Sequence, residues 1–357
     1  MSMPIFEKWC WRNPPTFFIP LLLLMALALA YSNSLHGPFV FDDFESIVEN
    51  PSIRSLPQSI LLTSYGGTPV SGRPLLNFSL AVNYSLGGLS VEGFHIVNFG
   101  IHLLAMLLLF DFLRRTLTLS SFSDSIRRDA SWIAGSIAGL WALHPLQTES
   151  VTYIVQRAES LMGFFYLLTL YCFVRSHSST RATWWLIFSV FFCFCGMGTK
   201  EIMVSAPWIV FLYDVIFIER KFQSLWKSRR LYYWGLISSW ILLAFLIVSY
   251  DKKGDVIGFF GKISFLDYLQ TQYWAICHYL KLILWPNPLI LDYGTLTITS
   301  FDKVFPSFLI CFVLGAGLAW LFWRDPHWGF WGVWGAFVLA PTSLIPIHTQ
   351  TIAEHRV

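Results

Sequence analysis

Residues 17–32 read FFIPLLLLMALALAYS, and none of these side chains is charged. A helix needs about 20 mainly apolar residues to cross a bilayer, and backbone groups in hydrocarbon must be hydrogen-bonded within their own segment. The stretch therefore predicts a membrane-spanning helix. We interpret it as an anchor rather than a signal peptide, because no small-residue cleavage site follows it cleanly.

Eight further apolar stretches have the same character, which predicts helices rather than the alternating strands of a barrel. They occupy residues 95–113, 131–146, 158–174, 183–198, 202–218, 231–249, 304–323 and 328–346. A tenth stretch, 269–285, is interrupted by polar side chains and ends in Trp285-Pro286. The fold class predicted is an all-α polytopic membrane protein, with about 9–11 transmembrane helices in one domain over residues 1–357.

The composition agrees with this fold class. Hydrophobic residues make up 55% of the chain and charged residues 13%, whereas a soluble domain carries about 25% charged residues. Lipid is therefore the expected solvent. The formal net charge of +3 is too small to indicate a nucleic-acid partner.

Basic loops predict the orientation, because short loops rich in Lys and Arg stay in the cytoplasm. Lys8 and Arg12 precede the first span, and further basic residues follow the second, fourth and sixth spans. The N-terminus is thus expected in the cytoplasm, with a large first external loop over about 33–94. External positions are also predicted for 147–157, 199–201 and the residues after 250. We expect 269–285 to dip into the outer interface, because polar side chains and prolines suit an interfacial helix.

The first external loop carries three carboxylates within four residues, at Asp42, Asp43 and Glu45. Adjacent carboxylates repel, so at least one should have a raised pKa, as a general base requires. Two other interpretations stay open. The aspartates could cap a short helix, or the three carboxylates could bind Mg²⁺ or Mn²⁺.

Further charged residues lie beside the outer ends of the predicted spans. Arg73 is set among small and apolar residues, where it could bind a phosphate or lie at the interface. Glu149 and Arg157 are eight residues apart, which predicts roughly one helix face and either a site or an ion pair. The other members of these clusters are His144, Glu159, Lys200, Glu201, Glu354, His355 and Arg356.

In this order and on these loops, the residues resemble the transmembrane-and-tetratricopeptide-repeat (TMTC-like) protein O-mannosyltransferase family, whose membrane domain has the GT-C architecture. The resemblance runs along nearly the whole chain. Its carriers are Phe41-Asp42-Asp43, Arg73-Pro74 with Asn77, His144-Pro145 through Glu149 and Arg157 to Glu159, Lys200-Glu201, Trp285-Pro286 with Asp292-Tyr293, and Glu354-His355-Arg356.

The resemblance implies inverting transfer of a sugar, mannose in animal members, from a polyprenyl-phosphate donor to an acceptor hydroxyl outside the cytoplasm. The acceptor would be a protein or a lipid. Asp42 or Asp43 would be the base. Arg73, Arg157, Lys200 and Arg356 would be the candidates to bind the donor phosphate. The resemblance implies no cofactor with certainty. The expected location is a bacterial inner membrane, or the endoplasmic reticulum membrane in a eukaryote.

The sequence departs from the family in one respect, since the tetratricopeptide repeats, with a period of about 34 residues, are not found in it. We expect the chain to be truncated after Val357, which follows a charged cluster directly. Two other functions remain as alternatives, a transporter or flippase for a lipid-linked substrate and a non-catalytic membrane scaffold. A transporter should place polar groups near the bilayer midplane, whereas these charges gather at one end of the spans.

Overall fold

The computed structural model describes residues 18–60, 68–219, 222–249, 263–348 and 350–356. Within these ranges the regular structure is helical and contains no β-strand. The all-α fold class is therefore confirmed. Lys8 and Arg12, the expected truncation after Val357, and the first residues after 250 lie outside the described ranges.

Helices occupy all nine predicted ranges and the tenth stretch. The long ones are α2 (Phe18–Tyr31), α4 (Pro74–Gly87), α5 (Val91–Leu117), α6 (Asp124–Ala142), α8 (Arg157–Ser176), α9 (Ala182–Met197), α11 (Phe222–Val248), α12 (Phe265–Leu284), α13 (Phe301–Arg324) and α14 (Pro326–Leu344). The shorter ones are η1 (Phe44–Val48), η2 (Pro51–Arg54), α3 (Leu56–Ile60), α7 (Gln147–Thr152), η3 (Ile154–Gln156), η4 (Glu201–Ser205), α10 (Ala206–Tyr213), η5 (Asp214–Ile218) and η7 (Glu354–Arg356).

Four helical stretches are long and apolar enough to cross a membrane, namely Val91–Leu117, Glu201–Ile218, Trp226–Val248 and Phe301–Arg324. The chain is thus a polytopic membrane protein. Helices α2 and α9 are apolar but shorter. Membrane crossing by the other predicted spans stays a prediction. Of the four stretches, Phe301–Arg324 is the least covered by the rest of the protein, and almost all of it is exposed. Such exposure is expected for a helix that faces lipid.

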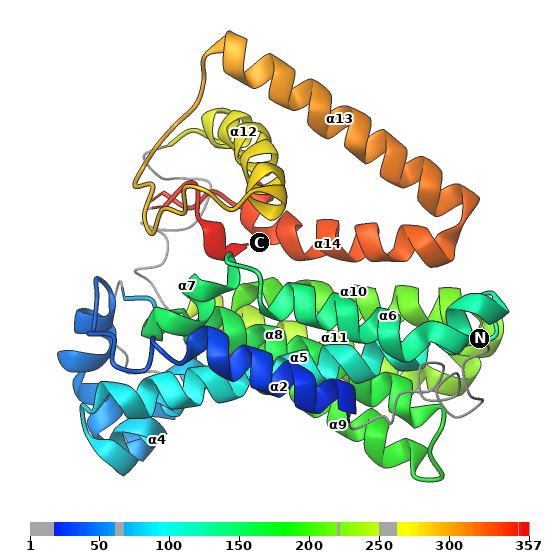
Figure 1. Ribbon diagram of the computed structural model, residues 1–357, viewed down its shortest axis with the longest axis horizontal. Helices are drawn as coiled ribbons and strands as arrows, with labels where there is room; N and C mark the ends of the chain where they lie inside the picture. The colour runs from blue at the N-terminus through cyan, green and yellow to red at the C-terminus, as the bar shows by residue number, and fades with distance from the viewer. Residues whose placement is uncertain (1–17, 61–67, 220–221, 250–262, 349, 357) are drawn as a thin grey trace, which may run out of the picture.

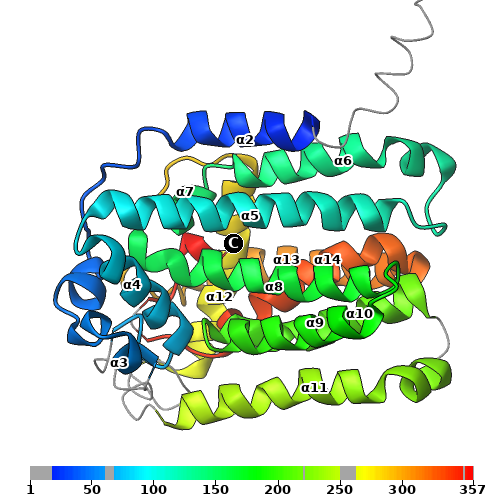
Figure 2. The same ribbon diagram turned by 90° about the horizontal axis from the view of Figure 1, so that it is seen from below.

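Successive helices of the bundle run in opposite directions (Figures 1 and 2). We call the end at which α2 ends and α5 begins the outer end; it lies at the left of Figure 1. The segments predicted to be external, around α4, α7 and the α9–η4 turn, all lie there. The connections that carry the basic residues lie at the opposite end.

Helix α12 does not follow the direction of the bundle. In Figure 2 its axis runs at a steep angle to α5 and α8, and Figure 1 shows it beyond α14 rather than against them; it packs on α13 and α14. Helix α11 ends and α13 begins toward the outer end. A helix at the outer interface would have this placement. The η7 segment consequently returns to the outer end after α14 (Figure 1), where it packs against α7.

Helix α2 packs closely on α6 through glycine. A Cβ atom added at Gly135 would lie 2.6 Å from Ile19 Cγ2, and one added at Gly139 would lie 2.8 Å from Leu23 Cδ2. Small residues one helical turn apart allow helix backbones to approach closely in a membrane. This contact holds the start of α2 against the bundle.

The substitution Gly135→Val should weaken the α2–α6 contact, because the new side chain overlaps the branched Ile19. Overpacking of this kind typically costs about 1–3 kcal/mol. We expect a lower midpoint of thermal unfolding in detergent. Gly163→Val is the matched control, since a Cβ atom there meets nothing within 4 Å. An equal effect of both substitutions would contradict the packing argument and would point to helix propensity alone.

Candidate functional site

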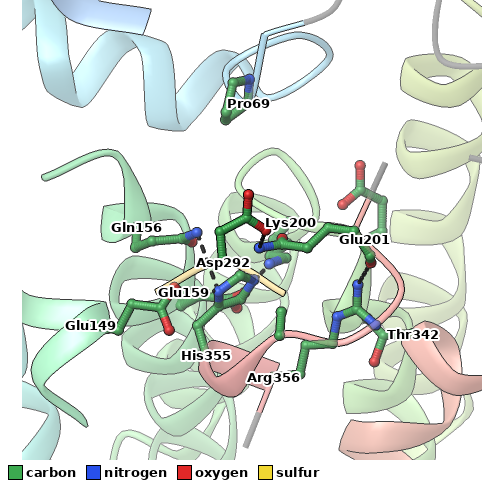
Figure 3. A network of polar contacts seen from close by, with 12 residues as sticks. Pro69, Glu149, Gln156, Glu159, Lys200, Glu201, Asp292, Thr342, His355 and Arg356 are labelled. Carbon is green, nitrogen blue, oxygen red and sulfur yellow. Dashed lines mark hydrogen bonds and ion pairs between the residues drawn. The ribbon is translucent and has the colours of Figure 1, made fainter. Parts of the chain in front are cut away.

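A chain of ionisable groups crosses the outer end and centres on His355 (Figure 3). Its Nδ1 atom lies 2.7 Å from Glu149 Oε1, and its Nε2 atom lies 3.6 Å from Glu159 Oε1. Glu159 in turn forms an ion pair with Lys200. Four segments meet here, namely α7, the start of α8, the turn after α9, and η7. We call these four residues the His355 chain.

Burial sets the proton positions in the His355 chain. It raises the pKa of Glu149 to about 8, with the negative charges of Glu159 and Glu354 acting in the same direction. Burial lowers the pKa of His355 well below its usual value, and the neighbouring Lys200 adds to the effect. At neutral pH the protonated Glu149 therefore donates its O–H to a neutral His355 ring. The Nδ1 atom of His355 also lies 3.3 Å from Gln156 Nε2.

Arg73 lies at the start of α4 and forms an ion pair with Glu201 at 3.1 Å. Its Nη1 atom donates to the carbonyl oxygen of Pro69 at 2.9 Å. The buried Nε atom has no hydrogen-bond partner among the described residues. Arg73 thus retains a donor for a ligand, and its side chain is 15% exposed.

The two adjacent aspartates have different surroundings. Asp43 is fully buried, and its carboxylate accepts from Val155 N at 2.8 Å and Val40 N at 3.1 Å. Burial nevertheless raises its pKa to about 6. Both carboxylate oxygens are therefore occupied by the protein, and Asp43 joins the first external loop to the α7–α8 junction.

Asp42 is exposed to solvent. Its backbone N–H donates to the Tyr153 hydroxyl at 3.0 Å. Loss of part of the carboxylate's hydration raises the pKa of Asp42, with smaller contributions from Glu45 and Asp292, while a hydrogen bond from Tyr153 opposes the shift. The preceding Phe41 has a φ of 44°, which non-glycine residues rarely adopt. The expected raised pKa is confirmed for both aspartates, with burial rather than mutual repulsion as its main cause.

Arg157 lies away from the His355 chain, and the expectation that it shares a helix face with Glu149 is wrong. Helix α7 ends at Thr152, and a separate helix begins at Arg157, so no continuous helix joins the two residues. Arg157 is fully buried. Its guanidinium donates to Asn98 Oδ1 at 2.6 Å and Asn83 Oδ1 at 2.8 Å, and to the carbonyl oxygens of Ser79 and Phe94.

Two further predicted site residues, Arg356 and Glu354, lie in η7. Arg356 donates to the carbonyl oxygens of Thr351, at 3.0 Å, and Gln350. Glu354 Oε1 accepts from Ile290 N at 2.8 Å and from the Tyr293 hydroxyl at 2.6 Å.

His144 lies within hydrogen-bond distance of the carbonyl oxygen of Ile283, at 3.0 Å, near the end of α12. Its Nδ1 atom accepts from Leu146 N at 3.2 Å. His144 therefore connects the α6–α7 turn to α12.

A cavity of about 460 Å³ lies beside these groups; we call it the outer cavity. Its polar lining includes Glu149, Glu354, His95 and Tyr153, and much of the rest is apolar, with Val40, Leu146 and Leu291 among it. Small-molecule sites are typically cavities of roughly 300–1,000 Å³ with an apolar lining and a few polar groups.

The alternative of a Mg²⁺ or Mn²⁺ site, which the sequence leaves open, has no support in the described part of the chain. No group of three or more His, Cys, Asp or Glu side chains there could hold a metal ion. The carboxylate of Asp43 is occupied by two backbone N–H groups, which leaves Asp42 and Glu45 as the accessible pair in that loop.

Several residues at the outer end were not among those predicted from the sequence. His95 lies between apolar residues, Tyr153 follows Thr152, and Gln156 directly precedes Arg157. None of the three side chains carries a formal charge that would mark it. Asn98 lies inside a predicted span, and an amide in that setting is a signal that could have identified it as a partner for a buried charge.

Comparison with known proteins adds independent information. The chain is 33% identical to human protein O-mannosyl-transferase TMTC2 over 233 residues, which are 59% of this chain and 26% of that protein. It is 31% identical to human protein O-mannosyl-transferase TMTC1 over 219 residues, 56% of this chain and 24% of the relative.

A third relative is protein O-mannosyl-transferase F38B6.6 of Caenorhabditis elegans, 34% identical over 166 residues, 44% of this chain and 23% of the relative. The chain resembles the TMTC-like family. It spans about a quarter of the length of these TMTC-like relatives. No family model matches the chain, and no solved structure matches it.

The substitution Glu149→Gln should change how stability depends on pH. A carboxyl whose pKa is raised by folding, here from 4.5 to about 8, favours the folded state below pH 4.5. That contribution is lost as the pH rises to about 8. The amide introduced by Glu149→Gln donates to His355 at any pH. We expect unfolding in detergent to show the variant equal to wild type near pH 4.5 and roughly 2–5 kcal/mol more stable at pH 9. A constant difference across this range would contradict the assignment.

Proposed function

We propose that this protein is a membrane glycosyltransferase that moves a sugar, mannose in the first instance, from a polyprenyl-phosphate donor to an acceptor hydroxyl on a protein. The reaction would take place on the non-cytoplasmic side, at the outer end of the bundle. The observation that carries the proposal is the accessible carboxylate of Asp42 at the same end as Arg73 and Lys200. The printed names of the TMTC-like relatives support the reaction class.

Asp42 is the general base in this proposal. Its carboxylate is accessible and its pKa is raised, which suits a group that must accept a proton near neutral pH. Asp43 is a positioning residue, because its two oxygens accept from one backbone N–H group in the first external loop and one between α7 and α8. The Asp42 N–H to Tyr153 hydrogen bond orients the same turn.

The reaction is balanced without a further reactant. The acceptor O–H gives its proton to the Asp42 carboxylate while its oxygen forms a bond to the anomeric carbon of the sugar. The bond between that carbon and the phosphate oxygen breaks, and the electron pair leaves with the polyprenyl phosphate. Attack on the face opposite the leaving group inverts the anomeric configuration.

Arg73 is the foremost candidate to bind the departing phosphate. It offers a guanidinium with an unpartnered Nε atom, and a planar guanidinium matches phosphate geometry. Lys200 is second, since it is paired with Glu159 and nearly buried. Arg157 and Arg356 are less suited, because protein oxygens already surround their guanidinium groups. Positive charge beside the leaving phosphate stabilises the transition state.

The substitution Asp42→Asn should lower the rate of sugar transfer about 10²–10⁴-fold, the usual contribution of a general base. The assay uses the purified protein with a radiolabelled polyprenyl-phosphate mannose donor and a Ser/Thr-containing peptide. Glu45→Gln, in the same loop and also exposed, is the matched control and should transfer normally.

Full activity of the Asp42→Asn variant would remove Asp42 from the role of base. Failure of the wild type to turn over or bind the donor would contradict the transferase proposal. Movement of the intact donor across vesicles, without transfer, would instead favour the flippase alternative.

The substitution Arg73→Lys should raise the donor KM about tenfold or more. Lysine keeps the charge but loses the planar fork that binds a phosphate with two hydrogen bonds. The measurement is transfer rate against donor concentration. Arg127→Lys is the control, because Arg127 lies in an exposed pair at the start of α6, away from the site. An unchanged donor KM for Arg73→Lys would contradict the phosphate role.

A further inference from the structure

The outer cavity contains more hydrogen-bond acceptors than its protein surroundings use. Glu354 receives two donors on Oε1. Glu149 is bonded through Oε1 to His355. Glu149 also has a backbone hydrogen bond with His355. A carboxylate has about four lone-pair sites, and a protonated carboxyl group keeps part of that capacity, so both residues can still accept hydrogen bonds from a ligand in the cavity.

His95 provides a separate observation of the same kind. It lines the cavity and is 3% exposed. Its Nε2 atom donates to the carbonyl oxygen of Gly37 at 3.0 Å, which leaves Nδ1 as an acceptor in the neutral ring. This buried Nδ1 atom has no partner among the described residues. A buried polar atom without a partner costs about 1–3 kcal/mol, so a ligand that donates to it gains affinity.

The remaining lining selects among ligands that carry several O–H donors. The apolar wall formed by Val40, Leu146 and Leu291 suits the C–H faces of a ring. The Glu354 carboxylate disfavours an anionic group in the cavity. Tyr153 lines the cavity and also accepts the Asp42 N–H, so the cavity adjoins the turn that carries the proposed base.

We propose that the outer cavity is the subsite for the neutral hexose ring of the donor, whose hydroxyl groups donate to Glu354, Glu149 and His95. This inference rests on the proposed transferase function, and it assigns the sugar and the phosphate to different groups. The ring occupies the outer cavity, and the phosphate lies toward the cations. Glu354 is then a specificity-determining residue.

The test is binding of free methyl α-mannopyranoside to the purified full chain in detergent, measured by saturation-transfer NMR. We expect the wild type to bind the sugar, and we expect Glu354→Gln to bind it with a dissociation constant at least tenfold larger. The amide introduced by this substitution keeps an Oε1 acceptor for Ile290 and Tyr293 but places an N–H₂ group where the second oxygen lay. Glu92→Gln is the matched control, because Glu92 is exposed at the start of α5 and does not line the cavity.

A second variant approaches the cavity from its apolar wall. Leu291→Trp adds volume to the cavity wall while keeping the Glu354 carboxylate, and it should also abolish sugar binding. It keeps the test valid if Glu354→Gln fails to fold, as judged by its thermal unfolding. Unchanged sugar binding by a folded Glu354→Gln and by Leu291→Trp would overturn the subsite, as would binding of ethanolamine with no binding of the sugar.

The outcomes separate this inference from the proposed function. If the wild type transfers mannose but both cavity variants keep the donor KM and sugar binding of the wild type, the subsite fails and the transferase stands. If the wild type binds the sugar through Glu354 and never turns over a donor, the subsite stands and the transferase fails.

Discussion

The buried carboxylate of Asp43 is the interaction on which the outer end depends. It binds the backbone N–H groups of Val40 and Val155, 115 residues apart. The contact with Val155 is buried and the contact with Val40 is part-buried. An unpaired buried amide is costly, so the two segments remain together. The turn at Phe41 and Asp42 is positioned as a result, with the carboxylate of one aspartate satisfied by the protein and that of its neighbour left accessible.

A second constraint is charge balance. Lys200 is paired with Glu159, Arg73 with Glu201, and the neutral His355 with a protonated Glu149. Buried charges without partners would be strongly destabilising. A phosphate that binds a cation here must therefore compete with a carboxylate already in place. Ligand affinity therefore depends on both members of each pair.

Much of the fold follows from the sequence, because apolar runs of the right length have few alternatives in lipid. The ranges of the helices and the gathering of charged segments at one end could be predicted. The break at Tyr153 could not be, since the residues around it are compatible with a continuous helix. The difference between Asp42 and Asp43 depends on Val155, far away in the chain. Arg157 shows the same limit: its charge marks it as important, but only the three-dimensional arrangement gives it Asn98 and Asn83 as partners.

The position of η7 has a consequence for biosynthesis. His355 and Glu354 belong to a segment made after α14, yet they complete contacts with α7 and with the loop after α12. The polar groups at the outer end must therefore wait, incompletely partnered, while all preceding helices are inserted. An insertion intermediate would expose Glu149, Glu159 and Lys200 to the interface without His355. Such an intermediate would be a natural substrate for membrane chaperones or quality-control proteases, and arrest of translation before residue 350 would leave an inserted bundle without a finished site.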